Sequence, residues 1–575
     1  MSHSLAPADY LIVVGYFLVM LGIGVFFSRR MKSMKDFFGG NQQVPWWVSG
    51  VSLYMTSFSA FAFVAYSALA YQHGMVSITI WWAVVPCCLV SAQFFAARWR
   101  RAAATSPLEY VETRYGPFLR QGFAWLGVPL LVIDDALKLF VIGKMVTVSL
   151  GVTAPFAFPL AIVICGSIML AYTFMGGLWA AMITDFVQFV VMAGAVMVLV
   201  PLALARVGGI GAFFQQAPEG FWAPTGGEYT WAWIIPFIFV QVFAYSTKWS
   251  YVQRYYSVKT DADARKVGYL VAALTFVGMP LLFLPAMAAR IFMPGVSEPN
   301  DVYVLLCKSL FPVGMIGMMV AAMFSATMST LSGDYNAMAS VITNDIYKRL
   351  FARVSSERSL VLAGRMATLV VGLAALGIAL LLVAGQGKED LVEYMARLFS
   401  VLMPPVAIPM MFGLLTRRVS NAGGVAGFLI GAGFGITAYF LSYCEGLGFL
   451  RTMPFLPWIT SVPTLVGLGL FSVLIPDAPE HGERIARFLD GLSRPEAAPS
   501  SSATDTSVAP AAIRIIGLAS AAMGVVLVVA VLATEPFSRC KLSVGVGVAM
   551  VLIGLGVRRI AGTIRVPEGS SGGLS

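Results

Sequence analysis

Long apolar segments separated by short polar turns recur along the whole chain. Runs rich in Leu, Val, Ala, Gly and Met repeatedly reach the ~20 residues that a helix needs to cross the hydrocarbon core of a bilayer. The strict apolar–polar alternation of a membrane β-barrel is missing from these runs. The pattern predicts an all-α polytopic membrane protein with about fifteen spanning helices, at 9–28, 45–72, 78–99, 118–150, 154–174, 178–206, 228–249, 264–292, 312–344, 359–386, 390–417, 422–443, 456–475, 512–533 and 540–559.

Composition agrees with this pattern and narrows the class of protein. Apolar residues make up 58% of the 575 positions, charged residues only 11%, and the mean hydropathy is +0.82. Soluble domains carry roughly a quarter charged residues, so we expect the lipid bilayer to cover most of this chain. The formal net charge is +10, but the basic residues lie in scattered turns, which argues against a nucleic-acid partner. The six cysteines show no metal or disulfide spacing and no nucleophile motif occurs, so we expect neither an enzyme nor an organic cofactor.

The basic turns all fall on one side of the membrane if the spans alternate. They follow the first, third, seventh, ninth, eleventh and last spans, and they include Arg114 after the third and Arg254 after the seventh. Because basic loops stay in the cytoplasm, the N-terminus is predicted outside and the C-terminus inside. The first span has no cationic segment before it, so we interpret 9–28 as a retained helix rather than a signal peptide.

One stretch, 476–511, has the Pro, Ala, Ser and Thr bias of a flexible linker, with a short amphipathic piece near Ile485–Leu492. The predicted division is a transmembrane core at 1–475, this cytoplasmic linker, two appended spanning helices at 512–560 and a cytoplasmic tail at 561–575.

Polar residues inside a spanning helix are costly, so each indicates a partner or a function. Thr56, Ser57 and Ser59 interrupt the second span, where an unwound helix could present carbonyl oxygens to a cation. In the ninth span, Ser329 and Thr330 offer neighbouring hydroxyl oxygens that suit sodium. The alternative is that these small residues only pack helices together, and the pattern alone favours it.

Isolated charges within the apolar runs also need partners. Asp185 requires a cation, Lys or Arg, unless it is an interfacial acid near the helix end that Gly176 and Gly177 mark. Other charges lie on several spans, where they could neutralise one another or contact a solute: Asp134, Asp135, Lys138, Lys248, Asp334 and Arg397. The sequence leaves both uses open.

Five motifs occur in one order along the chain. They are DFFGGNQQVPWW at 36–47, GGLWAAMITDFVQ at 176–188, VQR at 252–254, Ala326 with Ser329 and Thr330 followed by TNDIYKRL at 343–350, and FGLLTRR at 412–418 after two prolines. In this order they resemble the sodium:solute symporter family, which includes sodium–glucose, proline and sialic-acid cotransporters, over residues 9–475. The resemblance implies a LeuT-type core, in which two inverted five-helix repeats begin at 45–72 and 228–249 after one leading helix.

The resemblance also implies which residues hold the coupling ion, sodium. The ligands would be backbone oxygens near the break in the second span, two hydroxyls of the ninth span and a nearby acid: Met55, Phe58, Ala326, Ser329, Thr330 and Asp185. Some relatives hold a second sodium, for which Ser332 matches but Gly333 stands where a serine would be expected.

The implied solute site departs from the sugar-transporter pattern. The positions that would contact solute are Ser59, Ala62, Trp81, Lys248 and Arg397. Lys248 and Arg397 stand where sugar transporters have Asn and Gln, and two cations suit a carboxylate. The alternative is that both cations pair with the acids of neighbouring spans.

The resemblance therefore implies a cell-membrane transporter that couples inward sodium movement to uptake of a small organic solute, expected to bear a carboxylate, by alternating access. Its partners would be sodium, the solute and the bilayer; the sequence makes no prediction of oligomeric state. Two alternatives stay open: a proton-coupled symporter in which Asp185 carries the proton, and a solute sensor that does not transport.

Overall fold

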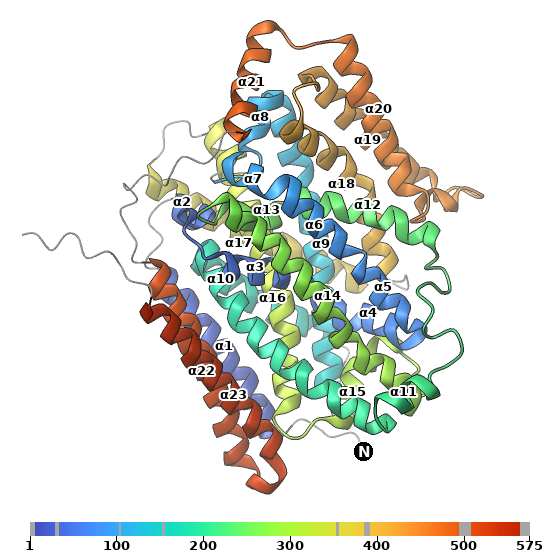
Figure 1. Cartoon of the computed structure of the whole chain (residues 1–575), viewed down its shortest axis with the longest axis vertical. Helices are drawn as coiled ribbons and strands as arrows, with labels where there is room; N and C mark the ends of the chain where they lie inside the picture. The colour runs from blue at the N-terminus through green and yellow to red at the C-terminus, as the bar shows by residue number, and fades with distance from the viewer. Residues whose placement is uncertain are drawn as a thin grey trace, which may run out of the picture.

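The computed structural model describes residues 6–28, 34–102, 105–151, 154, 156–351, 356–384, 391–493 and 508–563. Every named element within these ranges is a helix, which confirms the all-α prediction. The helices form one bundle, shown in Figure 1 with its longest axis vertical.

The elements up to the middle of the chain form a first set of helices. They are α1 (Pro7–Ser28), α2 (Met34–Gly39), α3 (Trp46–Thr56), α4 (Ala60–His73), α5 (Met75–Trp82), α6 (Val84–Val90), α7 (Ala96–Ala102), α8 (Glu109–Tyr115), α9 (Pro117–Leu150), α10 (Ala157–Val207) and α11 (Ile210–Gln216).

The second set begins with another pair of short helices. It comprises α12 (Trp231–Thr247), α13 (Trp249–Tyr256), α14 (Asp261–Phe292), α15 (Val302–Leu310), α16 (Met315–Val341), α17 (Glu357–Ala384), α18 (Leu391–Leu415), α19 (Asn421–Leu441), α20 (Leu456–Leu474), α21 (Pro479–Ser493), α22 (Val508–Thr534) and α23 (Phe537–Thr563). Short 3-10 turns occur at Gly40–Gln42, Pro299–Asp301 and Gly448–Arg451, and π-helical segments at Ser91–Phe95 and Ile342–Phe351.

Eleven of the described helices are long and apolar enough to cross a membrane, or twelve when the bent pair α3 and α4 counts as one span. This measure confirms a multi-pass protein but does not confirm about fifteen spans. The shortfall falls at three predicted spans, 118–150, 228–249 and 390–417. There α9 carries several charges, α12 stops after 17 residues, and α18 contains three prolines. The charges on α9 and the early end of α12 keep these two helices from counting as spans, and both also form part of the candidate site.

The long helix α10 contains the break that the sequence placed at Gly176–Gly177. Gly177 has φ 58° and ψ −166°, and a Cβ there would lie 2.9 Å from the carbonyl oxygen of Phe37. Glycine adopts this conformation without steric cost. The break divides α10 into the two predicted spans on either side of it.

The last helices attach to the outside of the bundle. The hairpin of α22 and α23 lies beside α1 (Figure 1), and α22 also contacts α10. The amphipathic helix α21 buries Ile485, Leu489 and Leu492 and contacts α7 and α8, so part of the expected linker is an ordered helix. Residues 494–507 of that linker and the tail from 564 fall outside the described residues, and the domain division stays a prediction.

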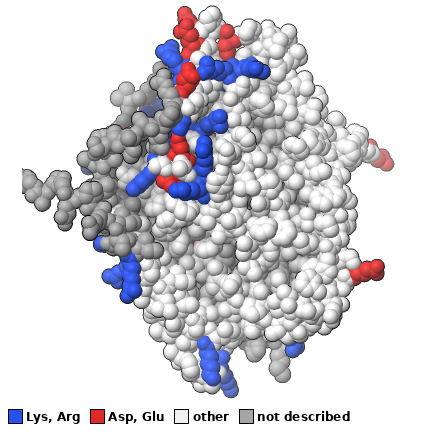
Figure 2. All heavy atoms as spheres, in the orientation of Figure 1, with Lys and Arg blue, Asp and Glu red and all other residues white. Residues whose placement is uncertain are grey.

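Charged side chains are unevenly spread over the surface. On the face shown in Figure 2 they gather mainly at the upper left, near α21 and α7, with a few at the lower end and acidic side chains at the right edge, and the broad surface between them is uncharged. This distribution fits a bilayer around the middle of the bundle. The orientation of the termini stays a prediction.

Candidate functional site

Two broken helices face the centre of the bundle. The chain leaves the helical path between α3 and α4, which are bent by 59°. Ser59 Oγ accepts a hydrogen bond from the Phe61 N–H at 3.3 Å, and Thr327 Oγ1 of α16 accepts one from the Ala60 N–H at 2.9 Å. Between α12 and α13, Lys248 has ψ 126°. The first helix of each expected repeat is thus broken, which is where transporters of this type bind their ligands.

A group of oxygens gathers where the first break meets α16. Thr330 Oγ1 donates to the carbonyl of Phe58 at 2.7 Å and to that of Ala326 at 3.0 Å. Ser329 Oγ is buried and lies near the Asp185 carboxyl, without a hydrogen bond of full geometry to the described residues. The structure thus brings together three predicted sodium ligands, with the Ser329 hydroxyl next to them in the chain. Carbonyl and hydroxyl oxygens are hard ligands that fit sodium.

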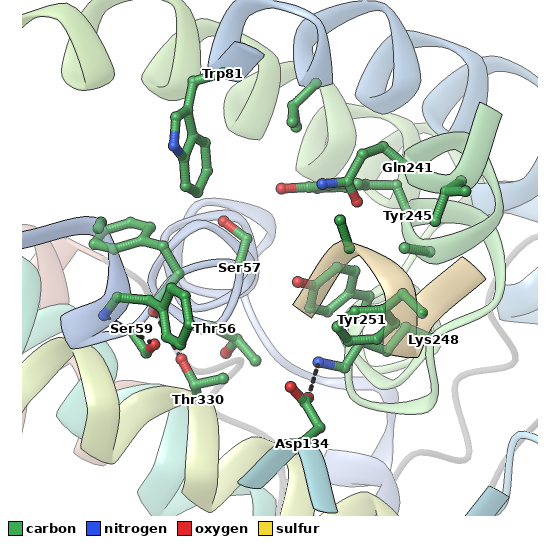
Figure 3. Close-up of a pocket in the computed structure, with 18 of the residues that line it drawn as sticks. Thr56, Ser57, Ser59, Trp81, Asp134, Gln241, Tyr245, Lys248, Tyr251 and Thr330 are labelled. Carbon is green, nitrogen blue, oxygen red and sulfur yellow. Dashed lines mark hydrogen bonds and ion pairs between the residues drawn. The ribbon is translucent and has the colours of Figure 1, made fainter. Parts of the chain in front are cut away.

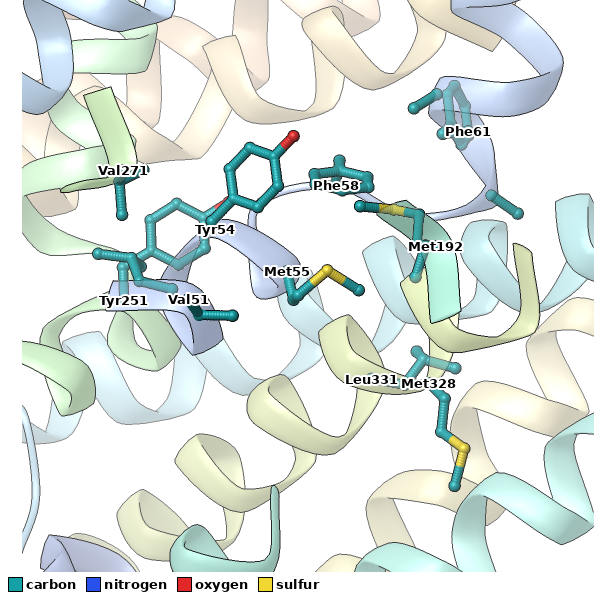
Figure 4. Packing of buried hydrophobic residues seen from close by; sticks show 14 of the residues in the cluster. Val51, Tyr54, Met55, Phe58, Phe61, Met192, Tyr251, Val271, Met328 and Leu331 are labelled. Carbon is teal, nitrogen blue, oxygen red and sulfur yellow. The ribbon is translucent and has the colours of Figure 1, made fainter. Parts of the chain in front are cut away.

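The side chains around this group are apolar. Met55 and Phe58 belong to the same buried cluster as Met192, Met328 and Leu331 (Figure 4). Met55 lies in the last turn of α3, where carbonyl groups lack a complete set of helical partners. Met55 and Phe58 can therefore offer only backbone oxygens, as the resemblance implied.

Asp185 has a buried basic partner. The Asp185 side chain is 0% exposed. Its Oδ2 accepts a hydrogen bond from Ser52 Oγ at 2.5 Å and lies 3.5 Å from Arg254 Nη2. Arg254 also donates to Ser52 Oγ at 3.1 Å, to Thr56 Oγ1 at 3.0 Å and to the Ser250 carbonyl at 2.8 Å. The interpretation of Asp185 as an interfacial acid is therefore wrong, because the carboxylate lies in the core with a cation beside it.

Arg254 corrects a second expectation. We interpreted it as a basic residue of a cytoplasmic turn, but it is fully buried in α13. Arg114, predicted in another such turn, is also fully buried, and it donates to the carbonyls of Thr416 and Val419. The demand of Asp185 for a partner was the sequence signal that could have found Arg254, since a buried carboxylate needs a cation nearby.

The guanidinium of Arg254 also bears on the second sodium. A Cβ on Gly333 would lie 3.0 Å from Arg254 Nη2, so the side chain occupies the space that a serine at this position would need. Ser332 Oγ donates to the Ser329 carbonyl at 3.1 Å. The positive charge of Arg254 therefore lies beside Asp185, the acid that the resemblance would assign to a second sodium.

Five further charges form one buried network. Lys138 Nζ lies 2.8 Å from both Asp134 and Asp135 and 2.7 Å from Asp334. Lys248 Nζ lies 3.2 Å from Asp334 and 3.5 Å from Asp134. These side chains are at most 5% exposed. Lys248 thus pairs with acids of neighbouring helices, as the alternative interpretation held, but its ion pairs are longer than those of Lys138.

A cavity of about 130 Å³ lies between the two breaks, with this network forming part of its wall (Figure 3). Four predicted solute contacts line it: Ser59, Ala62, Trp81 and Lys248. Arg397 does not line it among the described residues, although Ala396 and Phe399 of the same helix do. The role of Arg397 as a solute contact stays a prediction.

The sequence interpretation missed Gln241 and three tyrosines of the cavity, Tyr66, Tyr245 and Tyr251; Figure 3 labels Gln241, Tyr245 and Tyr251. Gln241 and Tyr245 precede Lys248 at helical spacing along α12, so they share one face of that helix. Lys248 lies at the end of an apolar run, and its charge was the sequence signal that could have pointed to this face of α12.

Comparisons with known proteins agree with the geometry. Residues 37–431 match the family model described as the sodium:solute symporter family. The sodium/sialic acid symporter SiaT of Proteus mirabilis (strain HI4320) is 25% identical over 455 residues, covering 74% of this chain and 88% of that protein. Sodium/glucose cotransporter 1 of Ovis aries is 24% identical over 488 residues, covering 77% of this chain and 73% of that protein.

Two solved structures show the fold. A substrate-bound, outward-open Na+-coupled sialic acid symporter matches with a TM-score of 0.72 at 22% identity, over 82% of this chain and 98% of that one. Mhp1, a nucleobase-cation-symport-1 family transporter in a closed conformation, matches with a TM-score of 0.52 at 14% identity, over 79% and 98%. They confirm the LeuT-type architecture. Since the family model covers well over half of the chain, this protein belongs to the sodium:solute symporter family and is a multi-pass, sodium-coupled transporter rather than an enzyme.

Proposed function

We propose that this protein uses an inward sodium gradient to take up a small organic solute that bears a carboxylate, by alternating access. The observation that carries the proposal is the position of Thr330. Its hydroxyl joins the carbonyls of Phe58 and Ala326, and the same residue lines the cavity. An ion bound there lies against the wall of the solute site.

This proximity supplies a physical route for coupling. A sodium ion held by the break and by α16 would fix the position of α4, whose residues Phe61 and Ala62 line the cavity. Sodium would thereby favour the conformation that binds solute, and the solute would favour sodium binding by the same factor. One sodium entering through 100 mV releases ~2.3 kcal/mol, and a tenfold gradient adds about 1.4 kcal/mol.

Lys248 supports the proposal that the solute bears a carboxylate. It lies at the break between α12 and α13, lines the cavity, and holds its acidic partners only at 3.2 and 3.5 Å. Its ammonium group can therefore donate to a solute oxygen while it keeps the ion pairs. Arg397 is proposed as a second, indirect contribution from α18, next to the lining residues Ala396 and Phe399.

Uptake by purified protein in proteoliposomes tests the proposal. Monocarboxylates, amino acids, sialic acid, sugars and vitamins would be supplied outside, with an inward gradient of sodium or of choline. We expect one class, bearing a carboxylate, to accumulate only with sodium. Equal accumulation driven by a proton gradient without sodium would replace the proposal with the proton-coupled alternative. Binding without any accumulation would favour the sensor.

A further inference from the structure

The network behind the cavity has one more acidic group than basic groups. It contains three carboxylates, Asp134, Asp135 and Asp334, and two ammonium groups, Lys138 and Lys248, linked by contacts of 2.7 to 3.5 Å. Every member is at least nine-tenths buried. When all five groups are ionised, they sum to one negative charge. An uncompensated charge in such a place is costly.

The ions of the proposed cycle balance this charge. Asp185 and Arg254 form a pair of zero net charge. One sodium at the oxygens around Thr330 adds a single positive charge beside the cavity, which compensates the network. The loaded site is then neutral if the solute has no net charge, whereas a simple carboxylate would restore the uncompensated negative charge.

Both signs of charge face the cavity. Lys138 and Lys248 line it, and so does Asp134, which is 0% exposed. Asp134 Oδ2 receives the ion pairs of both lysines, while its Oδ1 has no hydrogen-bond partner in the described part of the chain. Asp134 and Lys248 lie 3.5 Å apart (Figure 3). Adjacent groups of opposite charge match a solute whose carboxylate and cationic nitrogen are attached to the same carbon.

Aromatic side chains form a large part of the cavity wall. Phe58, Tyr66, Trp81, Phe237 and Tyr251 are among them, together with Phe399. Aromatic faces attract a cationic nitrogen and also pack against an apolar side chain. This part of the wall can therefore hold both the nitrogen and the side chain of an amino acid.

We propose that the solute is a zwitterion of the α-amino acid type, with its carboxylate on Lys248 and its cationic nitrogen on Asp134. The proposal rests on the proposed sodium-coupled uptake and specifies its substrate class. It also fixes the charge balance: one sodium with one zwitterion moves one net positive charge inward per cycle. One sodium with a monocarboxylate would move none.

Matched sets of compounds test the substrate class. Thermal unfolding of the purified full chain would be followed in sodium and in choline buffer with L-alanine, L-leucine, L-proline and L-phenylalanine. Each would be compared with the carboxylic acid that lacks its nitrogen and the amine that lacks its carboxylate. We expect at least one amino acid to stabilise the protein in sodium, with both fragments at least tenfold weaker. The stabilising amino acid should also evoke an inward current on solid-supported membranes.

Two variants test the contact itself. Asp134→Asn should weaken amino acid binding at least tenfold. It should also reduce the ratio between the affinity for the amino acid and the affinity for the carboxylic acid that lacks its nitrogen. Asp135→Asn makes the same charge change in the same network, but Asp135 does not line the cavity, so the preference for the zwitterion should persist. An equal loss of preference in both variants would overturn the assigned contact.

The outcomes separate this inference from the function beneath it. Sodium-dependent stabilisation by carboxylic acids or sugars, with none by amino acids, would overturn the zwitterion and leave sodium-coupled transport standing. Electroneutral sodium-dependent uptake of the ligand would also overturn the zwitterion and leave sodium-coupled transport standing. An absence of any sodium-dependent ligand would overturn both.

Discussion

The buried hydroxyl of Ser329 offers a variant that separates sodium binding from folding. Ser329 is 0% exposed, and its Oγ lies near the Asp185 carboxyl without a hydrogen bond of full geometry to the described residues. Removing a hydroxyl that is so weakly bonded costs little, and alanine is the stronger helix former. We therefore expect Ser329→Ala to change the melting temperature little in sodium-free buffer.

In sodium the same variant should be impaired. A contact between a hydroxyl and a charged group contributes about 1.5–3 kcal/mol, so its loss should weaken sodium binding by roughly tenfold to a hundredfold. At a sodium concentration one hundred times the dissociation constant, binding stabilises the folded protein by about 2.7 kcal/mol. A site tenfold weaker would give only about 1.4 kcal/mol under the same conditions.

The assay is thermal unfolding of purified protein during a sodium titration, with choline holding the ionic strength constant. Ser325→Ala is the matched control: Ser325 lies one turn earlier on α16, is equally buried, and donates to the Ala321 carbonyl at 2.7 Å. Its sodium titration should match the parent protein. A Ser329→Ala titration that also matches the parent would refute the assignment of Ser329 as a ligand.

Further perturbations follow from the residues of the site. Lys248→Gln should raise the dissociation constant of the transported solute at least tenfold in calorimetric titration, and Arg397→Gln should weaken solute binding more than folding; unchanged affinity in both would remove the carboxylate contact. Asp185→Asn should destabilise sodium-free protein by about 3–5 kcal/mol, because Arg254 keeps an unpaired buried charge. Adding Arg254→Gln should recover part of that loss in thermal unfolding, and further destabilisation would contradict the pairing. Gly333→Ser should lower the melting temperature, since its Cβ would lie 2.9 Å from Thr56 Cγ2 and 3.0 Å from Arg254 Nη2, and an unchanged melting temperature would contradict this crowding.

Much of the fold follows from the sequence, because apolar length and ordered motifs carry the information. The apolar runs predict an all-helical membrane protein, and the motif order predicts the LeuT-type core that the comparisons confirm. The break at Gly177 follows from a conformation that glycine adopts readily. The count of about fifteen spans is not confirmed, because α9 carries several charges and α12 ends after 17 residues.

Part of the candidate site could be predicted from the sequence, and part could not. The oxygens around Thr330 are local to two motifs, so the resemblance locates them. The pairing of Asp185 with Arg254 joins residues 69 positions apart, and a basic residue next to an apolar run resembles a topology signal until the fold buries it. Which lysine pairs with which acid depends on distances of 2.7 to 3.5 Å between different helices, and residue spacing along the chain does not determine such distances.

Equilibrium binding of radioactive sodium to the purified protein tests the central claim most directly, because it needs no knowledge of the solute. We predict saturable binding of one sodium per chain, displaced by unlabelled sodium, weakened at least tenfold by Ser329→Ala and unchanged by Ser325→Ala. The absence of saturable binding, or binding that Ser329→Ala leaves intact, would contradict a coupling ion held between the α3–α4 break and α16.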